Sequence, residues 1–306
     1  MVNLCHPRFV VTPQIESIAV LTDLSANMAA PLSFASSLAQ QNHASIVLAH
    51  AYIPLPSAFA APTAALVEKS LEVERRHLAD ALEKEQRDFF PGIRSTHVLV
   101  EGSPKDMLTQ LKGADLIVVG TSGTRGLEKV AFGSTAEAVF RSSAVPVLTV
   151  GPHCSCSSND PEKLPTVLFA TDFMAGVEQA ISYALLLAHQ QHARLVLLNA
   201  AATQEVPPAL DQEAAKEARR AALEELLPQD YGLTPAPICV VEFGTPSQVI
   251  LDQARSWNAT MIVMGAHPSH FAHAASHTSG GLAYHVAAAA QCPVFIVPER
   301  CSPARV

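Results

Sequence analysis

The sequence is poor in charged residues and has no segment suited to crossing a membrane as a helix. Only 16% of its 306 residues are charged, whereas 49% are hydrophobic. This balance suits an α/β protein whose parallel sheet is covered on both faces. The formal net charge of −8 argues against broad binding of nucleic acids or anionic membranes, because such binding needs a basic surface. The longest apolar stretch, residues 48–67, is interrupted by His50 and by prolines and makes a poor membrane-spanning helix.

Two further absences bear on the compartment. The chain has only six cysteines, and in a sequence of this length they do not form a disulfide framework. Residues 1–10 lack an apolar segment followed by a small-residue cleavage site, so no signal peptide is recognised. We therefore expect a cytoplasmic protein with neither nucleic-acid nor membrane partners.

The chain repeats itself, and the repeat decides the expected architecture. SIAVLTDLS at 17–25 corresponds to PTVLFATDF at 165–173, and ADLIVVGT at 114–121 corresponds to ATMIVMGA at 259–266. Each copy consists of short apolar strands that alternate with helical patterns, which is typical of a parallel sheet with crossover helices. Helical spacing of apolar residues predicts the following helices: 26–41, 63–90, 174–191 and 209–227.

The repeat also gives the domain boundaries. We predict a first domain at residues 1–151, a polar Pro- and Ser-rich linker at 152–164, and a second domain at 165–306. In both domains a Gly-Ser/Thr-Pro sequence opens the third helix. Ser103 and Thr245 suit its N-cap position, because a hydroxyl there can accept a hydrogen bond from a free backbone N–H.

The stretch GTSGTRGLEKVAFGST, which follows the apolar run in the first domain, indicates a phosphate site. Glycines at the end of a strand let a ligand approach the backbone closely, because no Cβ blocks it. The final Ser-Thr pair precedes a helical pattern whose first N–H groups favour phosphate oxygens. The spaced residues are Gly120, Gly123, Gly133, Ser134 and Thr135.

This Gly-x2-Gly-x9-Gly-Ser/Thr pattern resembles the ATP-binding signature of the universal stress protein family. The resemblance implies an α/β fold of two tandem, doubly wound parallel-sheet domains, of the adenine-nucleotide α-hydrolase-like type, with the ligand at the carboxyl ends of the first and fourth strands. It also implies that the domains pair through their last strands, here residues 144–150 and 291–297. Whether the chain pairs further as a homodimer is left open.

The resemblance further implies ATP as the ligand, with or without Mg²⁺, and a set of contacts. In the family the Asp after strand one reaches the adenine and ribose, the residue at the end of strand two contacts adenine, and the glycine loop holds the phosphates. The corresponding residues are Thr22, Asp23, Ala51, Gly120, Gly123, Gly133, Ser134 and Thr135. A structural alternative exists for Asp23, since Asp172 holds the same place in the second domain and both suit a helix cap.

The second domain departs from the pattern. Gly265 is kept, but Pro268 stands in place of the second glycine, and Gly280-Gly281-Leu282 replace the final Gly-Ser/Thr. We therefore expect the second domain to stabilise the first without binding ATP. The replacement segment is rich in histidine, and on a helix three of these side chains would share one face, where they could hold zinc. The histidines concerned are His267, His270, His273 and His277.

No dedicated catalytic site is recognised in the sequence. It contains no Walker-type G-x4-G-K-[ST] loop and no supported Ser/His/Asp arrangement. We expect an ATP-binding regulatory protein of the stress response, with at most weak ATP hydrolysis. The alternative is a structural stress protein that binds a metal or small ligand through residues 267–285 and leaves the first loop empty.

Overall fold

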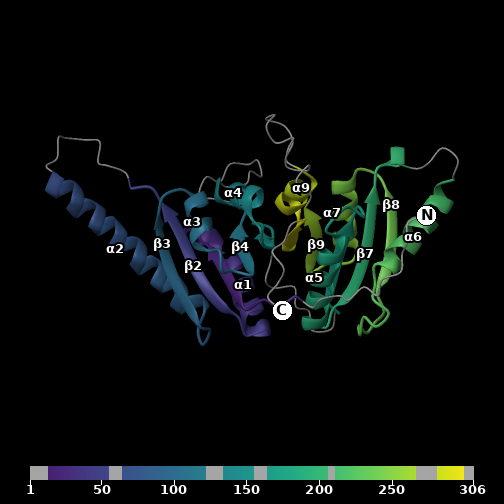
Figure 1. Ribbon diagram of the computed structural model, residues 1–306, viewed down its shortest axis with the longest axis horizontal. Coiled ribbons are helices and arrows are strands. Elements are labelled where there is room, and N and C mark those ends of the chain that lie inside the picture. Colours follow the sequence, from purple (N-terminus) through teal and green to yellow (C-terminus); the bar gives the residue numbers. More distant parts are fainter. Residues whose placement is uncertain are drawn as a thin grey trace. The chain divides into compact units, whose positions relative to one another are not determined.

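The chain separates into two compact units, one of Ile15–Pro152 and one of His153–Val306, to which Met1–Gln14 are also assigned. We call them the N-terminal and the C-terminal unit (Figure 1). The computed structural model describes the following residues: 13–54, 64–121, 134–154, 164–205, 211–266 and 281–299.

The N-terminal unit is built on a sheet of five parallel strands. Their order across the sheet is β3-β2-β1-β4-β5, so the chain turns back between β1 and β4. The strands form because their sequences are apolar almost throughout, as expected when helices cover both faces. The bounds are β1 (Ser17–Leu21), β2 (Ser45–Tyr52), β3 (Ser95–Glu101), β4 (Leu116–Gly120) and β5 (Val147–Val150).

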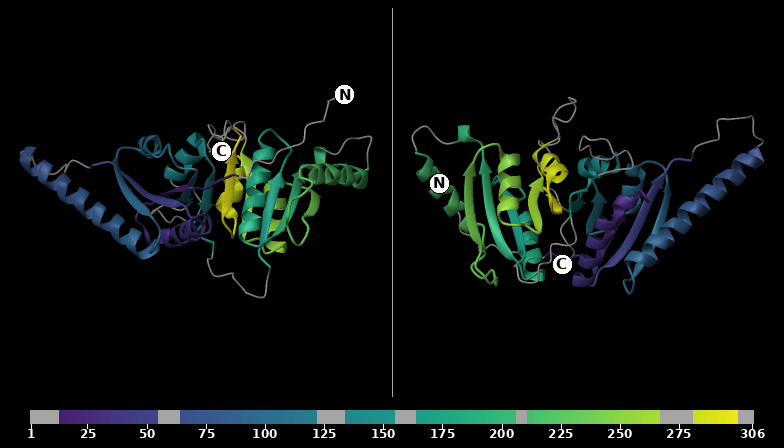
Figure 2. Two further views of the ribbon diagram at one scale, coloured as in Figure 1. Left: turned by 60° about the horizontal axis from the view of Figure 1, so that its bottom comes forward. Right: turned by 180° about the vertical axis from the view of Figure 1, so that it is seen from behind.

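Helices cover this sheet in two layers. The first two helices pack together on one face and the last two pack together on the other (Figure 2). The predicted helix 26–41 is a short 3-10 helix, η1, followed by α1, and the predicted helix 63–90 is α2. The bounds are η1 (Ala26–Met28), α1 (Ala29–Asn42), α2 (Ala64–Phe89), α3 (Pro104–Gln110) and α4 (Ser134–Ser142).

The C-terminal unit repeats the same design. Its parallel strands lie in the order β8-β7-β6-β9-β10. They are β6 (Thr166–Thr171), β7 (Arg194–Ala201), β8 (Ile238–Phe243), β9 (Met261–Ala266) and β10 (Val294–Pro298). The helical elements are α5 (Val177–Gln190), η2 (Thr203–Glu205), α6 (Gln212–Glu225), α7 (Pro246–Ser256) and α9 (Leu282–Ala289).

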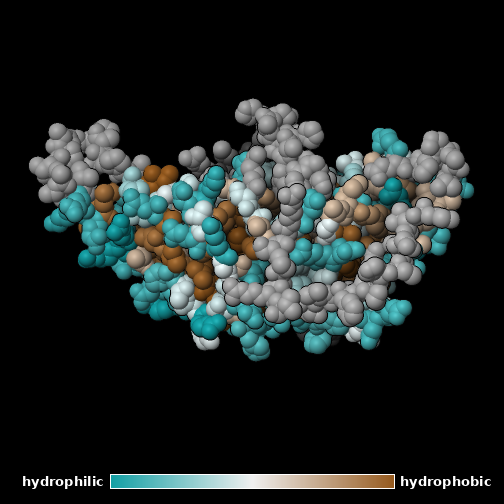
Figure 3. All heavy atoms as spheres, in the orientation of Figure 1, coloured by the Kyte–Doolittle hydropathy of each residue, from teal (hydrophilic) through white to brown (hydrophobic). Residues whose placement is uncertain are grey.

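The predicted fold, two doubly wound α/β domains in tandem, is confirmed. The core of each unit is the sheet itself, with side chains such as Leu48 and Phe169 fully buried. Hydrophilic residues dominate the described surface in Figure 3, with smaller apolar patches between them. Within the described ranges, no helix is both long and apolar enough to cross a bilayer. Pairing of the units through β5 and β10 stays a prediction.

The two predicted helix caps differ in the structure. At the start of α3 the Ser103 hydroxyl accepts a hydrogen bond from the Asp106 N–H, and Asp106 Oδ2 accepts from the Ser103 N–H at 2.8 Å. Thr245 also stands at the N-cap position of α7, but its side chain makes no capping hydrogen bond. The hydrogen bonds from Ser103 lower the pKa of Asp106, so this reciprocal cap is intact when Asp106 is ionised.

We therefore expect Ser103→Ala to destabilise the chain by about 1 kcal/mol at pH 7, because it removes a helix cap. The matched change Thr245→Ala should be nearly neutral, since no capping bond is lost. Urea unfolding at pH 7 measures both free energies. The effect of Ser103→Ala should shrink as the pH falls through the lowered pKa of Asp106. Equal losses in the two variants would contradict the assignment.

Candidate functional site

The predicted site residues that the structure describes lie at or near the carboxyl edge of the N-terminal sheet. Leu21, the last residue of β1, pairs with Ala49 of β2 and with Val119 of β4. The residues that follow these three positions therefore lie at one edge of the sheet. Ligands of open α/β sheets bind where the strand order reverses, and here the reversal falls between β1 and β4.

The Thr-Asp pair after β1 shapes a tight turn. Thr22 Oγ1 accepts a hydrogen bond from the Leu24 N–H at 2.9 Å, and Asp23 Oδ1 accepts one from the Ser25 N–H at 3.0 Å. These bonds hold Leu24 in a left-handed conformation, with φ of 59°, which a non-glycine residue adopts only when it is held there. Asp23 thus serves the turn before η1 and does not cap a helix itself.

The C-terminal unit contains the same turn. Thr171 Oγ1 accepts from the Phe173 N–H and Asp172 Oδ1 accepts from the Met174 N–H, both at 3.0 Å. Phe173 has φ of 63°. The repetition of Thr-Asp therefore has a structural cause, which applies whether or not a unit binds a ligand.

A polar side chain from the second strand fixes the end of the first strand in both units. His50 Nδ1 lies 2.8 Å from the backbone oxygen of Thr22. In the C-terminal unit the amide of Asn199 donates to the backbone oxygen of Thr171, also at 2.8 Å. Ala51, the predicted adenine contact, follows His50 and is half-buried at the end of β2. Its backbone is thus held in a fixed position beside the Thr-Asp turn.

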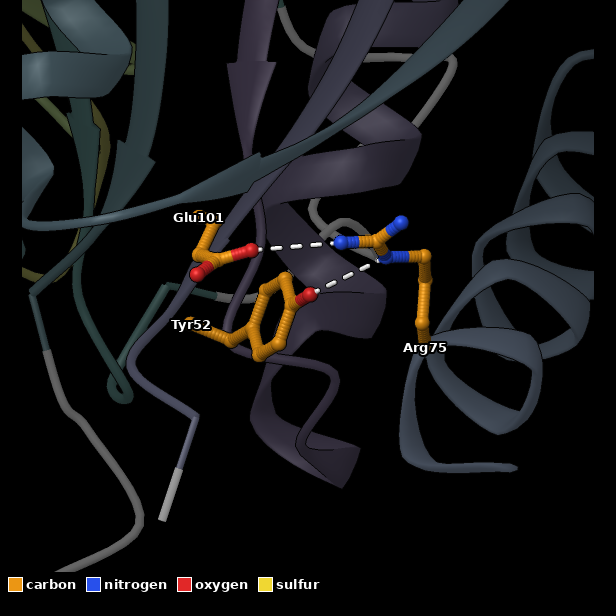
Figure 4. A network of polar contacts seen from close by, with 3 residues as sticks. All are labelled: Tyr52, Arg75 and Glu101. Carbon is orange, nitrogen blue, oxygen red and sulfur yellow. Dashed lines mark hydrogen bonds and ion pairs between the residues drawn. The ribbon is translucent and has the colours of Figure 1, made fainter. Parts of the chain in front are cut away.

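An arginine ties α2 to the ends of β2 and β3. Arg75 Nε donates to the Tyr52 hydroxyl at 3.3 Å, and Arg75 Nη2 donates to Glu101 Oε2 at 3.2 Å (Figure 4). The hydrogen bond with Tyr52, more than the charge of Glu101, raises the pKa of Arg75. The arginine side chain is exposed, so the network positions the strand ends more than it stabilises the fold.

Three buried oxygen atoms at this edge lack a hydrogen-bond partner among the described residues. They are Ser25 Oγ, Glu85 Oε2 and Thr121 Oγ1. Thr121 follows β4 directly and is only 2% exposed. A buried polar group without a partner costs about 1–3 kcal/mol, so these atoms are the groups that a polar ligand or bound water at this edge would satisfy.

Glu85 brings a carboxyl group from α2 close to the Thr-Asp turn. Burial raises its pKa, a hydrogen bond from the Thr22 side chain lowers it in part, and the negative charge of Asp23 raises it further. Glu85 is half-buried. Sequence reasoning missed this contact, because Glu85 lies within a long run of charged helix residues that resembles a solvated face.

Gly120 is packed against the start of the first helix. A Cβ built on Gly120 would lie 3.3 Å from Met28 Sδ and 3.5 Å from Pro31 Cγ. The absence of a side chain therefore lets η1 and α1 approach β4 closely. The family resemblance predicts that this glycine lines the ligand, which stays a prediction, whereas the structure shows its role in packing.

The phosphate end of the predicted site is described only in part. Ser134 and Thr135 are the first two residues of α4, as the predicted helix start requires. The backbone N–H groups of this first turn have no partner within the helix. Gly123 and Gly133 lie outside the described residues. The site residues as a set therefore stay a prediction.

At the same edge of the C-terminal unit lies a small cavity of about 30 Å³, part of which opens to solvent. It adjoins Gly265, the counterpart of Gly120, and a Cβ built on Gly265 would meet none of the described residues within 4 Å. Sequence reasoning missed this cavity. Aligning the two halves could have found it, because Val177 and Ala180 replace the larger Met28 and Pro31.

The proposed histidine site is not tested. His267, His270, His273 and His277 lie outside the described residues, and His285 is an exposed residue of α9. No group of three or more potential metal ligands occurs in the part of the chain that the structure describes.

Glu85→Gln should change the pH dependence of stability in a defined direction. A carboxyl with a raised pKa in the folded state binds its proton more tightly there than in the unfolded chain, so stability falls as the pH rises from about 4.5 through the raised value. We expect the variant to lose this fall and to be more stable than the parent at pH 7. Urea unfolding from pH 4 to pH 7, with the exposed Glu83→Gln as control, tests it. A loss of stability at pH 7 would contradict the assignment.

The two equivalent glycines should respond differently to the same change. Gly120→Ala forces Met28 to move and should cost about 1 kcal/mol or more through overpacking. Gly265→Ala adds a methyl group where no described residue lies within 4 Å, and it should be neutral or slightly stabilising. Chemical denaturation of both variants measures the difference, and equal costs would show that the packing at Gly120 is not tight.

The comparisons with known proteins agree with this architecture. The sequence profile of the Universal stress protein family matches residues 14–151 and 164–298. A universal stress protein of Mycolicibacterium smegmatis is 28% identical over 296 residues, which cover 92% of this chain and 97% of that protein.

Solved structures show the same fold. A universal stress protein from Archaeoglobus fulgidus superposes with a TM-score of 0.66 at 18% identity, covering 92% of this chain and 98% of that one. A functionally unknown protein from Pseudomonas aeruginosa gives a TM-score of 0.61 at 17% identity, covering 94% and 93%. With two matched family domains on two doubly wound units, the chain belongs to the universal stress protein family and is of its tandem type.

Proposed function

We propose that this protein is an ATP-binding regulatory protein of the stress response, which holds one nucleotide in its N-terminal unit. The observation that carries the proposal is the position of the glycine motif. It connects β4 to α4 at the edge where the strand order reverses, and the buried hydroxyl of Thr121 beside it lacks a partner among the described residues.

The groups at this edge suit the two ends of a nucleotide. On the β4–α4 side, the Thr121 hydroxyl and the free amides at the start of α4 are donors for phosphate oxygens. On the β1–β2 side, Asp23 and the backbone at Ala51 would contact the ribose and the base. The base and the ribose carry no charge, so backbone groups and the carboxylate of Asp23 suffice to bind them on that side.

The C-terminal unit serves, in this proposal, as the structural partner of the first. Its Gly265 is kept, yet Pro268 and Leu282 stand where the motif requires glycine and a hydroxyl residue. Proline lacks the N–H that a phosphate would use. Nucleotide occupancy of the first unit alone would then change the surface around residues 121–132, which is the regulatory signal we propose.

Isothermal titration with ATP and Mg²⁺ should give about one site per chain. Gly123→Val and Gly133→Val should abolish binding, because each side chain blocks the approach of phosphate to the backbone. The matched control is Gly113→Val, a glycine of the same unit whose Cβ would have nothing within 4 Å. Two equal sites, or none, would contradict the proposal.

Thr121→Val supplies an independent check on the same site. Removing a buried hydroxyl that lacks a partner among the described residues should leave the free protein at least as stable as before, whereas ATP affinity should fall.

Zinc analysis of untagged protein distinguishes the ATP-binding function from the alternative, metal-binding function. Stoichiometric zinc that survives dialysis, without ATP binding, would favour a metal-binding structural protein.

A further inference from the structure

Side chains from α2, β2 and β3 join the ends of the two strands in the N-terminal unit (Figure 4). Tyr52 lies opposite Glu101 in the register of the strands, so both side chains are on the same face of the sheet. Arg75 bridges them, with its Nε 3.3 Å from the Tyr52 hydroxyl and its Nη2 3.2 Å from Glu101 Oε2. The Gly102 N–H donates to the backbone oxygen of Tyr52 at 2.9 Å. We call Tyr52, Arg75 and Glu101 the arginine network, and it fixes the last residue of β2.

The C-terminal unit shares the backbone of this arrangement but not its side chains. The Gly244 N–H donates to the backbone oxygen of Ala201 at 2.9 Å, which is the counterpart of the bond described above. Ala201 and Phe243 therefore stand where the N-terminal unit has Tyr52 and Glu101. Neither side chain can accept a hydrogen bond from an arginine. The strand ends form without such a network, so the network points to a role particular to the N-terminal unit.

The network holds the neighbour of Ala51, whose backbone groups face the β1 side. Alternate residues of a strand direct their backbone groups to opposite sides. Tyr52 bonds toward β3, whereas the backbone oxygen of Ala49 accepts from the Thr22 N–H at 2.9 Å on the β1 side. Ala51 is in phase with Ala49. The Thr22 oxygen, which the Ala51 N–H would reach in a continued ladder, lies 2.8 Å from His50 Nδ1 instead. Ala51 thus directs a donor and an acceptor side by side toward the proposed nucleotide.

Such a pair of groups can distinguish one base from another. Adenine presents an acceptor beside a donor along one edge, whereas guanine presents two acceptors along the same edge. The discrimination depends on the direction of the Ala51 backbone groups, because hydrogen bonds weaken steeply when they are misaligned. Ala51 lies between His50, whose ring contacts the Thr22 oxygen, and Tyr52, which Arg75 contacts. Its orientation is therefore held from both neighbours.

We propose that Arg75 is a positioning residue for the base of the nucleotide: acting through Tyr52, it fixes the direction of the Ala51 backbone groups and so contributes to the selection of adenine. This inference rests on the proposed function, because it requires a nucleotide in the N-terminal unit. The side chains of Arg75 and Glu101 are 57% and 55% exposed, and exposed ion pairs contribute little to folding. Loss of the network should therefore change ligand selection more than stability.

Two variants of the full chain break the network at different atoms. Tyr52→Phe removes only the hydroxyl that accepts from Arg75, and Arg75→Met removes the donors while it keeps an unbranched side chain. The matched control is Arg76→Met, since Arg76 pairs with Glu72 and its side chain is 74% exposed. Isothermal titration with ATP and with GTP gives the ratio of the two affinities. The preference of the parent protein for ATP should fall roughly threefold or more in Tyr52→Phe and Arg75→Met and stay unchanged in the control.

Amide exchange supplies a second measurement, which needs no ligand. The Gly102 N–H, which bonds to the Tyr52 oxygen, should exchange roughly threefold or more faster in both variants. An unchanged exchange rate would overturn the proposal, and so would equal losses of ATP and GTP affinity, which indicate a merely structural role. A parent protein that binds no ATP would overturn the proposed function and this role with it. A parent that binds ATP, with variants that keep its preference for ATP, would overturn this role alone.

Discussion

In each unit the first helix lies beside a glycine at or near the end of the fourth strand. How closely the helix packs against this glycine limits the space for a ligand at the carboxyl edge. In the N-terminal unit Met28 and Pro31 close the space beside Gly120. A ligand there must lie further out, toward the segment that joins β4 to α4. In the C-terminal unit a Cβ at the same glycine position would meet no described residue within 4 Å. Protein interiors are closely packed and leave few voids, so the size of a few side chains decides whether a space is filled or open.

The rest of the edge is common to both units. The Thr-Asp turns at residues 22–23 and 171–172 make the same backbone hydrogen bonds. His50 and Asn199 differ in chemistry, yet each contacts the backbone oxygen at the end of the neighbouring strand at 2.8 Å. A rigid frame of this kind tolerates different binding chemistry on its loops and helix starts. The tandem chain therefore has two copies of one frame whose binding surfaces can differ independently.

The sequence predicted the strands and helices well because their causes are local. Runs such as LIVVG are apolar on both faces, and the amphipathic pattern of 63–90 gives α2 (Ala64–Phe89) nearly to the residue. The flanking glycine and proline predicted both N-cap positions, but only Ser103 has an aspartate three residues later to complete a reciprocal cap, whereas Thr245 has Gln248 there. The sequence alone could not place Glu85 beside Asp23, because that contact joins a helix and a turn far apart in the chain.

The distribution of charge explains why the two ends of the proposed N-terminal site would bind different parts of a nucleotide. Asp23 and Glu85 put carboxyl groups on the β1 side, where they repel each other enough to contribute to the raised pKa of Glu85. A triphosphate placed there would add to this repulsion. The start of α4 has the opposite polarity, because its free amides carry partial positive charge. A nucleotide would therefore be oriented by electrostatics, with its base toward β1 and β2 and its phosphates toward α4.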